Sequence, residues 1–197
     1  MEEAQKQELI IKAYEKGMQN EARATDCCQS TIAAIQDTIG CRNDAILKAG
    51  SAFAGGVGFT HLGQCGALTG AVMVISQLCG RSGWEFDQDA KREVNDPTFD
   101  YVRATKGWCY AYEMVERFII AYGSPICQEV SSKVIGRIDG EAYIRPDSPA
   151  KSLLSEKRRV GAHELEGCPT VVGTAAKWAT EIILREKLHN NDASQLL

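Results

Sequence analysis

The sequence predicts an all-α fold: a single compact bundle of about five or six helices, with a glycine-rich loop before a buried central helix. Three observations predict it. Apolar residues recur at helical spacing along most of the chain, no segment alternates apolar and polar residues as a half-buried strand does, and no repeat or linker divides the chain. With 197 residues, 44% of them hydrophobic, the chain can bury a core of its own. We therefore expect one domain over residues 1–190 and a flexible tail over 191–197.

The first two helices are predicted from amphipathicity and capping. Residues 4–20 place apolar side chains at helical spacing among glutamates and lysines, which is typical of an amphipathic helix. Thr25 and Asp26 then supply an N-cap for a second helix, which Gly40 can terminate.

A glycine-rich segment over residues 50–70 separates these helices from the centre of the fold. Glycine permits positive φ angles and close approach of the backbone to another group. The run that follows, residues 67–78, is apolar on nearly all sides and predicts a buried helix. The glycines of the segment are Gly50, Gly55, Gly56, Gly58, Gly63, Gly66 and Gly70.

The second half of the chain predicts one long and two further helical segments. Asn95-Asp96-Pro97 is a strong helix start, and helical periodicity then continues to Gly123. A short segment follows Pro125 as far as Val134, residues 136–167 form a long polar loop, and a last helix runs from Cys168 to Leu188. We expect the aromatic residues of the long helix to pack in the core; an electron route and a dimer seam are the alternatives. They are Trp108, Tyr110, Tyr112, Phe118 and Tyr122.

Charge and hydropathy exclude two classes of function. The chain has 22 basic and 26 acidic residues, a net charge of −4, and no concentrated basic stripe, so nucleic acid is not expected as a ligand. The triplet Lys157-Arg158-Arg159 is interpreted as part of a solvated loop in preference to a docking patch for an acidic electron donor. No apolar run is long enough to span a membrane and the start is too polar for a signal peptide, so we expect a cytoplasmic protein.

Eight cysteines, about 4% of the residues, are the unusual feature of the composition. In a reducing cytoplasm they indicate metal, cluster or thiol redox chemistry before disulfides. Apart from the adjacent pair Cys27-Cys28, neighbouring cysteines are at least 13 residues apart, so the chain has no local zinc knuckle and no CxxCH motif for covalent haem. A site of four thiolates would have to be assembled by the fold from distant segments.

Predicted helix starts contain some of these cysteines. Cys28, Cys65 and Cys168 lie in a first turn or directly before one, and Cys127 is near another. Free N–H groups and the helix dipole favour a thiolate, or an anionic cluster, at such positions. Buried packing, a metal-free dithiol and zinc are the alternatives for these four. The remaining cysteines, interpreted as packing or surface residues, are Cys27, Cys41, Cys79 and Cys109.

The order of the cysteines resembles the redox-active protein family named for its C_GCAxxG_C_C pattern. The resemblance spans about residues 5 to 185 and rests on the cysteine spacings of 37, 62 and 41. The segments that carry it are CQSTI at 28–32, FAGGVG at 53–58, CGALTG at 65–70, GSPIC at 123–127 and CP at 168–169.

This resemblance implies a helical redox domain related to the core of split-Soret cytochromes, a dimeric fold with an iron–sulfur cluster, 2Fe-2S in preference to 4Fe-4S. The haem motifs of those cytochromes are absent, so haem is not carried over. Cys27 and Cys28 point about 100° apart on a helix, and Cys28 is chosen from the family motif. The implied metal ligands are Cys28, Cys65, Cys127 and Cys168, and the implied cofactor-binding glycines are Gly55, Gly56 and Gly66.

The expected function is therefore an iron–sulfur electron-transfer protein, as an electron carrier or redox subunit in preference to a stand-alone enzyme. A homodimer and a redox partner protein or larger oxidoreductase complex are the expected partners. A metal-free thiol–disulfide redox protein or sensor that uses two of the same cysteines is the alternative. The glycine order fits no nucleotide-binding motif, and His61 is expected to be an exposed loop residue in preference to a ligand or proton-coupling group.

Overall fold

The computed structural model describes residues 2–135 and 166–189, and in these residues the all-α prediction is confirmed. Within them lie eight α-helices, one 3-10 turn and no strand beyond an isolated backbone bridge between Gln64 and Ile126. The expected loop with its basic triplet and the expected tail fall on residues outside the described ones. The helices are α1 (Glu3–Ala24), α2 (Cys27–Ile39), α3 (Asp44–Ala49), α4 (Gly66–Cys79), α5 (Gly83–Asp89), α6 (Tyr101–Tyr122), α7 (Cys127–Ile135) and α10 (Cys168–His189), with the 3-10 turn η1 at Gly50–Ala52.

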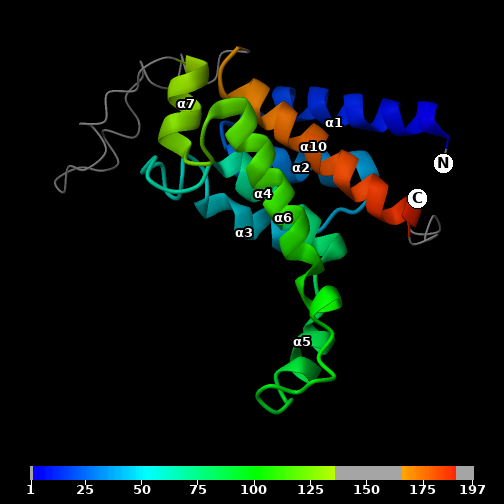
Figure 1. The fold of residues 1–197 in the computed structure, drawn as a ribbon. Coiled ribbons are helices and arrows are strands. Elements are labelled where there is room, and N and C mark those ends of the chain that lie inside the picture. The colour runs from blue at the N-terminus through cyan, green and yellow to red at the C-terminus, as the bar shows by residue number, and fades with distance from the viewer. Residues whose placement is uncertain (1, 136–165, 190–197) are drawn as a thin grey trace.

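The core lies where α1, α2, α4 and α10 pack on one another (Figure 1). Helix α4 is buried along most of its length, as its composition predicts. Glycine allows two of the helix contacts to be close: a Cβ on Gly70 would lie 2.5 Å from the carbonyl oxygen of Cys28 in α2, and one on Gly17 would lie 2.9 Å from the Cα of Gly173 in α10. The helices therefore meet backbone to backbone at these points.

The capping predicted for α2 is confirmed at both ends. The Asp26 carboxylate accepts a hydrogen bond from the Gln29 N–H at 2.9 Å, and Gly40 ends the helix in the left-handed conformation at φ 70°. This cap fixes the point at which α2 begins, and hence the positions of Cys27 and Cys28.

The predicted start of the long helix at Pro97 is wrong by four residues. The Asp96 carboxylate accepts hydrogen bonds from the N–H and hydroxyl of Thr98, which closes a turn, and Asp100 then caps α6 by accepting from the Arg103 N–H at 3.0 Å. Asp96 and Asp100 are both suitable N-cap residues, and the helix begins after Asp100.

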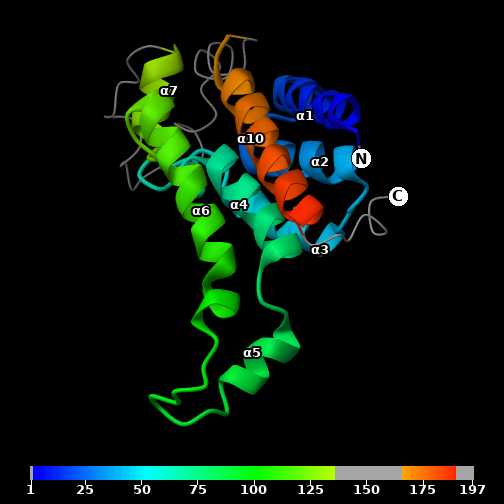
Figure 2. The ribbon, with the colours of Figure 1, turned by 45° about the vertical axis from the view of Figure 1, so that its right-hand side comes forward.

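Helix α5 and the chain that joins it to α6 extend away from the bundle as an arm, residues 83–100 (Figures 1 and 2). The sequence analysis missed α5, although Ser82 and Glu85 have the spacing of a capping box and form one here. Arg103 of α6 holds the arm by ion pairs to Glu85 at 2.9 Å and to Asp89 at 3.0 Å.

The prediction that the α6 aromatic residues pack in the core is wrong for two of them. Phe118 is fully buried, and its ring lies 5.8 Å from that of Trp178, but Trp108 and Tyr112 are 70% and 64% exposed. Helix α6 lies at the edge of the bundle (Figure 2), so only the side that faces α4 and α10 is covered. No helix in the described part of the chain is long and apolar enough to cross a membrane.

Candidate functional site

In the described part of the chain, three helices begin at a cysteine and a fourth has a cysteine as its N-cap. Cys27 is the first residue of α2, Cys65 is the N-cap residue of α4, and Cys127 and Cys168 are the first residues of α7 and α10. The prediction of helix starts is confirmed for Cys65 and Cys168, and Cys127, predicted near a helix start, is the first residue of α7. Cys28 lies in the first turn of α2 as predicted, as its second residue. Four N-terminal helix ends, each with backbone N–H groups and a partial positive charge, thus carry sulfur.

The fold brings these thiols into one region centred on Cys65. After burial, the proximity of Cys65 is a cause of the raised pKa of the Cys27, Cys127 and Cys168 thiols, and it also contributes at Cys28. Segments far apart in the sequence therefore supply four sulfur atoms that interact electrostatically with a fifth, that of Cys65.

Burial makes the neutral thiol the favoured form at each of these positions. It raises the pKa of Cys65 to about 11 and that of Cys28 to about 12, from an ordinary value of 9.0, and it raises the pKa of Cys27 well above that value. Backbone N–H groups of Ala67 and Leu68 lower the pKa of Cys65, as expected at a helix start, but burial is the larger effect. The expectation that helix starts make these cysteines thiolates is therefore wrong for the protein without a bound cation.

Cys27 and Cys28 face different surroundings. The Cys27 sulfur lies beside Gly66, where an added Cβ would be 2.4 Å away, and receives the Gly55 N–H. Cys28 is fully buried, with its sulfur next to Gly50 at the edge of the hydrophobic core. The Cys27 thiol interacts electrostatically with Cys168, whereas the Cys28 thiol interacts with Asp26 and Cys65.

The glycine-rich loop wraps the site in an unusual backbone conformation. Five consecutive residues, 55–59, have φ between 58° and 69°, and two of them, Val57 and Phe59, carry side chains that disfavour this region. A Cβ on Gly56 would lie 2.7 Å from the Cβ of Cys127, and one on Gly66 would lie 2.9 Å from the Phe53 carbonyl oxygen. Glycine at these positions lets the backbone lie against the cysteines.

Backbone hydrogen bonds fasten this loop to the start of α7. The Cys65 N–H donates to the Pro125 carbonyl at 2.8 Å, and the Cys127 N–H donates to the Gly63 carbonyl at 2.9 Å. His61 belongs to the same junction: it is half-buried, and its Nδ1 lies 3.8 Å from the Cys127 sulfur. The prediction of an exposed loop histidine is therefore wrong.

Glu21 is a buried acid close to the thiols that the sequence did not single out. Its side chain is 1% exposed near the C-terminal end of α1, and its carboxyl group contributes to the raised pKa of Cys27, Cys65 and Cys168. The signal was present, because Glu21 continues the buried positions Ile10, Ala13 and Gly17 at helical spacing. A carboxylate beside thiolates increases the negative charge that a bound cation would balance.

The other cysteines lie apart from this group. Cys41 and Cys79 are half-buried against the core, and Cys109 is exposed on α6, in line with their interpretation as packing or surface residues. Within residues 2–135 and 166–189, no three His, Cys, Asp or Glu side chains are arranged so that they could hold a single metal ion.

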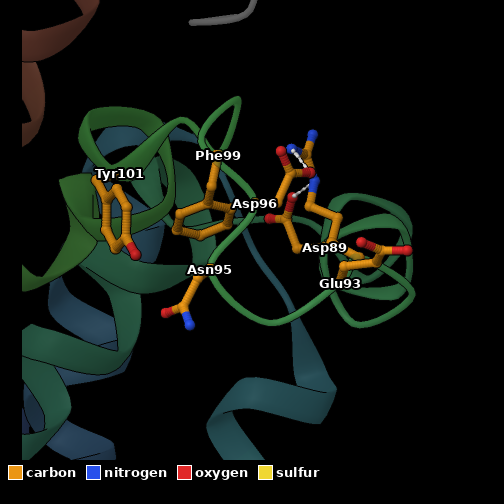
Figure 3. A pocket seen from close by; sticks show the side chains of 7 residues that line it. Asp89, Glu93, Asn95, Asp96, Phe99 and Tyr101 are labelled. Carbon is orange, nitrogen blue, oxygen red and sulfur yellow. Dashed lines mark hydrogen bonds and ion pairs between the residues drawn. The ribbon is translucent and has the colours of Figure 1, made fainter.

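A cavity of about 120 Å³ on the arm is a poor alternative site. Asp89, Glu93, Asn95, Asp96, Phe99 and Tyr101 line it together with Arg92 (Figure 3). Arg92 is engaged by ion pairs to Asp89 and Asp96 at 3.4 and 3.2 Å. Small-molecule pockets are typically about 300–1,000 Å³ and mostly apolar, so this cavity does not suit an organic substrate.

Thiols gathered at several helix starts of a helical protein are typical of redox-active proteins. The model of the family described as "Putative redox-active protein (C_GCAxxG_C_C)" matches residues 25–182, most of the chain. The protein belongs to this family, and the resemblance found in the sequence is confirmed. No curated protein and no solved structure matches the chain.

Proposed function

We propose that this protein transfers electrons by means of an iron–sulfur cluster held by the thiolates of Cys27, Cys65, Cys127 and Cys168. The observation that carries the proposal is that four helices begin at or directly after these cysteines and that the thiols interact around Cys65. We prefer Cys27 to the sequence-based choice of Cys28 because the charge of Cys168 contributes to the raised pKa of Cys27, whereas Asp26 and Cys65 are the charged neighbours that contribute at Cys28.

The residues around the thiols suit an anionic cluster. Thiolates are its usual ligands, and hydrogen bonds from backbone N–H groups stabilise its sulfur atoms. Gly55 and the first turn of α4 supply such donors, and Gly56 and Gly66 leave room where a Cβ would collide. A single zinc ion needs all its sulfur ligands about 2.3 Å from one point, whereas a cluster with two iron atoms divides its ligands between two points.

The cluster, when bound, supplies one-electron chemistry, and the chain supplies a shielded position for it. Cys65 and Cys127 are 6% and 7% exposed, so water is largely excluded from that side. The cavity on the arm is polar and has a volume of about 120 Å³, so it is a poor substrate site. We therefore propose an electron carrier or redox subunit whose partner is another redox protein or a larger oxidoreductase complex. The family resemblance favours 2Fe-2S over 4Fe-4S, a homodimer and a cytoplasmic location.

A pair of serine substitutions tests this proposal. Protein purified without oxygen should lose visible absorption and bound iron in Cys65→Ser, because Cys65 is the common neighbour of the other thiols. Cys109→Ser should keep both, because Cys109 is exposed on α6, away from the group. Equal loss from both variants would contradict the proposal.

The thiol–disulfide alternative is less well supported because its cysteines are buried with raised pKa values, whereas reactive thiols have lowered ones. Counting free thiols before and after mild oxidation separates the two functions. An iron-free protein that loses two thiols on oxidation would favour the alternative.

A further inference from the structure

The outward side of α6 is an apolar surface on an otherwise charged helix. At 100° per residue, one side of about 120° contains six large exposed apolar side chains, and Glu116 is the one charged residue there. We call this side the outer face of α6; it points away from the buried Met114 and Phe118. Its large apolar residues are Tyr101, Val102, Trp108, Tyr112, Ile119 and Ile120.

Six residues near one edge of the outer face have the spacing of a helix-pairing seam, and one of them, Val115, is half-buried against the core of its own chain. Steps of four, three, four, three and four residues join the six positions, as in the a and d positions of a heptad. All but one of the side chains are apolar or aromatic, and four of the six are exposed. The seam consists of Tyr101, Thr105, Trp108, Tyr112, Val115 and Ile119.

The seam is complementary to itself when reversed. A two-fold axis at the level of Tyr110 brings Trp108 of one copy opposite Tyr112 of the other. The same axis brings Tyr101 opposite Ile119 and Thr105 opposite Val115, so every seam position meets another seam position. Such mutual matching is what an isologous interface between identical chains requires.

The charged groups of α6 outside the outer face are already paired within the chain. Arg117 forms ion pairs with Glu181 at 2.6 Å and with Glu113 at 2.8 Å, and Lys106 is paired with Glu186. Because these groups are engaged with one another or with α10, the outer face offers little charge to an oppositely charged partner. An apolar, weakly charged surface is the better match, and the same face of a second copy is one.

The area is sufficient for association. Trp and Tyr side chains each offer roughly 150–250 Å², so the exposed large residues of the outer face present on the order of 800 Å², which is about what each partner buries in a stable complex. The helix is about 33 Å long at 1.5 Å per residue, so the seam extends along nearly its whole length.

We infer that the outer face of α6 binds α6 of a second copy of this chain, antiparallel, about a two-fold axis near Tyr110. The choice of a second copy as the partner rests on the homodimer in the proposed function. The inference does not depend on whether the thiols hold a cluster. In this arrangement the second copy covers Trp108 and Tyr112, which are otherwise exposed to water.

Molar mass in solution, measured by light scattering and sedimentation equilibrium at about 1–100 µM, tests the surface. The natural protein should be a dimer, and Trp108→Glu or Ile119→Glu should weaken association at least about tenfold, since central aromatic anchors dominate interfaces. Ile11→Glu is the matched control: Ile11 is 56% exposed on α1, a helix of the same length, and Ile119 is 47% exposed. The control should remain dimeric.

Disulfide trapping tests the orientation. In a Cys109→Ser background, Thr105→Cys and Val115→Cys chains should cross-link when mixed and not alone. A parallel pair would cross-link each variant with itself and contradict the antiparallel arrangement. A monomeric natural protein, or a dimer unaffected by Trp108→Glu, would overturn the inference. Iron content measured on the same samples separates this failure from failure of the cluster proposal.

Discussion

At Gly66 the backbone passes so close to Cys27 that a side chain has no room. An added Cβ would lie 2.4 Å from the Cys27 sulfur and 2.9 Å from the Phe53 carbonyl oxygen, and the second contact is with backbone that cannot rotate away. Gly66→Ala should therefore destabilise the protein by about 1–3 kcal/mol and lower bound iron, as measured by chemical denaturation and iron assay.

Gly107 provides the matched control for this substitution. It lies inside α6, and an added Cβ would make only an ordinary contact of 3.5 Å with Gly80. Gly107→Ala should stabilise the protein by about 0.5–1 kcal/mol, because alanine is the better helix former. Similar losses in both variants would show that the crowding at Gly66 is not the cause.

Adjacent cysteines at the start of α2 should respond differently to substitution. Cys27→Ser removes a sulfur that receives the Gly55 N–H and interacts with Cys168, so we expect loss of the visible spectrum and of bound iron. Cys28→Ser changes a fully buried core position and should lower the free energy of unfolding while iron is retained. If Cys28→Ser abolishes iron binding and Cys27→Ser does not, Cys28 is the ligand, as the sequence indicated.

The sequence alone could not decide whether Cys27 or Cys28 faces the other thiols. Asp26 and Gly40 predicted the ends of α2, because capping depends on residues next to one another in the chain. Which of Cys27 and Cys28 faces Cys168 depends on the rotation of α2 against α4, and tertiary packing alone sets that rotation. His61 and Glu21 escaped prediction for the same reason, since both lie near the thiols only through contacts between distant segments.

On the scale of the elements, the arm depends on acidic groups held in their charged form. Hydrogen bonds from the Ser82 backbone and hydroxyl, and then from Arg103, lower the pKa of Glu85 to about 2 from 4.5. A lowered pKa means that the stabilisation is present above pH 4.5 and is lost as the pH falls toward 2. Amide exchange in residues 83–89, corrected for the intrinsic pH effect, should accelerate over this range before exchange in α4 does.

Glu85→Gln is the control for this acid response. It keeps the shape of the side chain but removes the titrating charge, so exchange in the arm should be faster at neutral pH and should respond less to acid than in the natural protein, the remaining response coming from Asp89. An arm that loosens with the same pH profile in both proteins would show that another group is responsible.

The elements that the sequence mispredicted share a cause. α5 and the start of α6 lie in the arm, where short helices are specified by capping residues such as Ser82 and Asp100 and not by a long apolar period. The core assignment of Trp108 and Tyr112 failed because periodicity identifies an apolar side of a helix without saying whether this chain or another molecule covers it.

On the scale of the whole molecule, the site couples thiol ionisation to folding. The folded pKa of Cys65 is about 11, above the 9.0 of an ordinary thiol. The thiol is therefore protonated in both states below pH 9, and stability is lost as the pH rises from 9 toward 11, where only the unfolded chain ionises. Two pKa units correspond to about 3 kcal/mol. Urea unfolding of the iron-free protein at pH 8 and pH 10.5 should reveal this loss, and Cys65→Ala should reduce it.

The same coupling explains how this arrangement can hold a metal cluster. Buried neutral thiols must release protons when they bind iron, so binding should strengthen with rising pH, and the four helix starts and backbone N–H donors then stabilise the resulting negative charge. The fold therefore disfavours free thiolates, and under the proposed function a bound metal would neutralise them.

The most direct test of the central claim is the iron and acid-labile sulfide content of the natural protein purified without oxygen, together with its electron paramagnetic resonance spectrum after reduction. The account predicts about two iron and two sulfide per chain and a one-electron signal, as for a 2Fe-2S cluster. A well-folded protein isolated without oxygen that contains neither iron nor sulfide, and takes up neither on reconstitution, would contradict it.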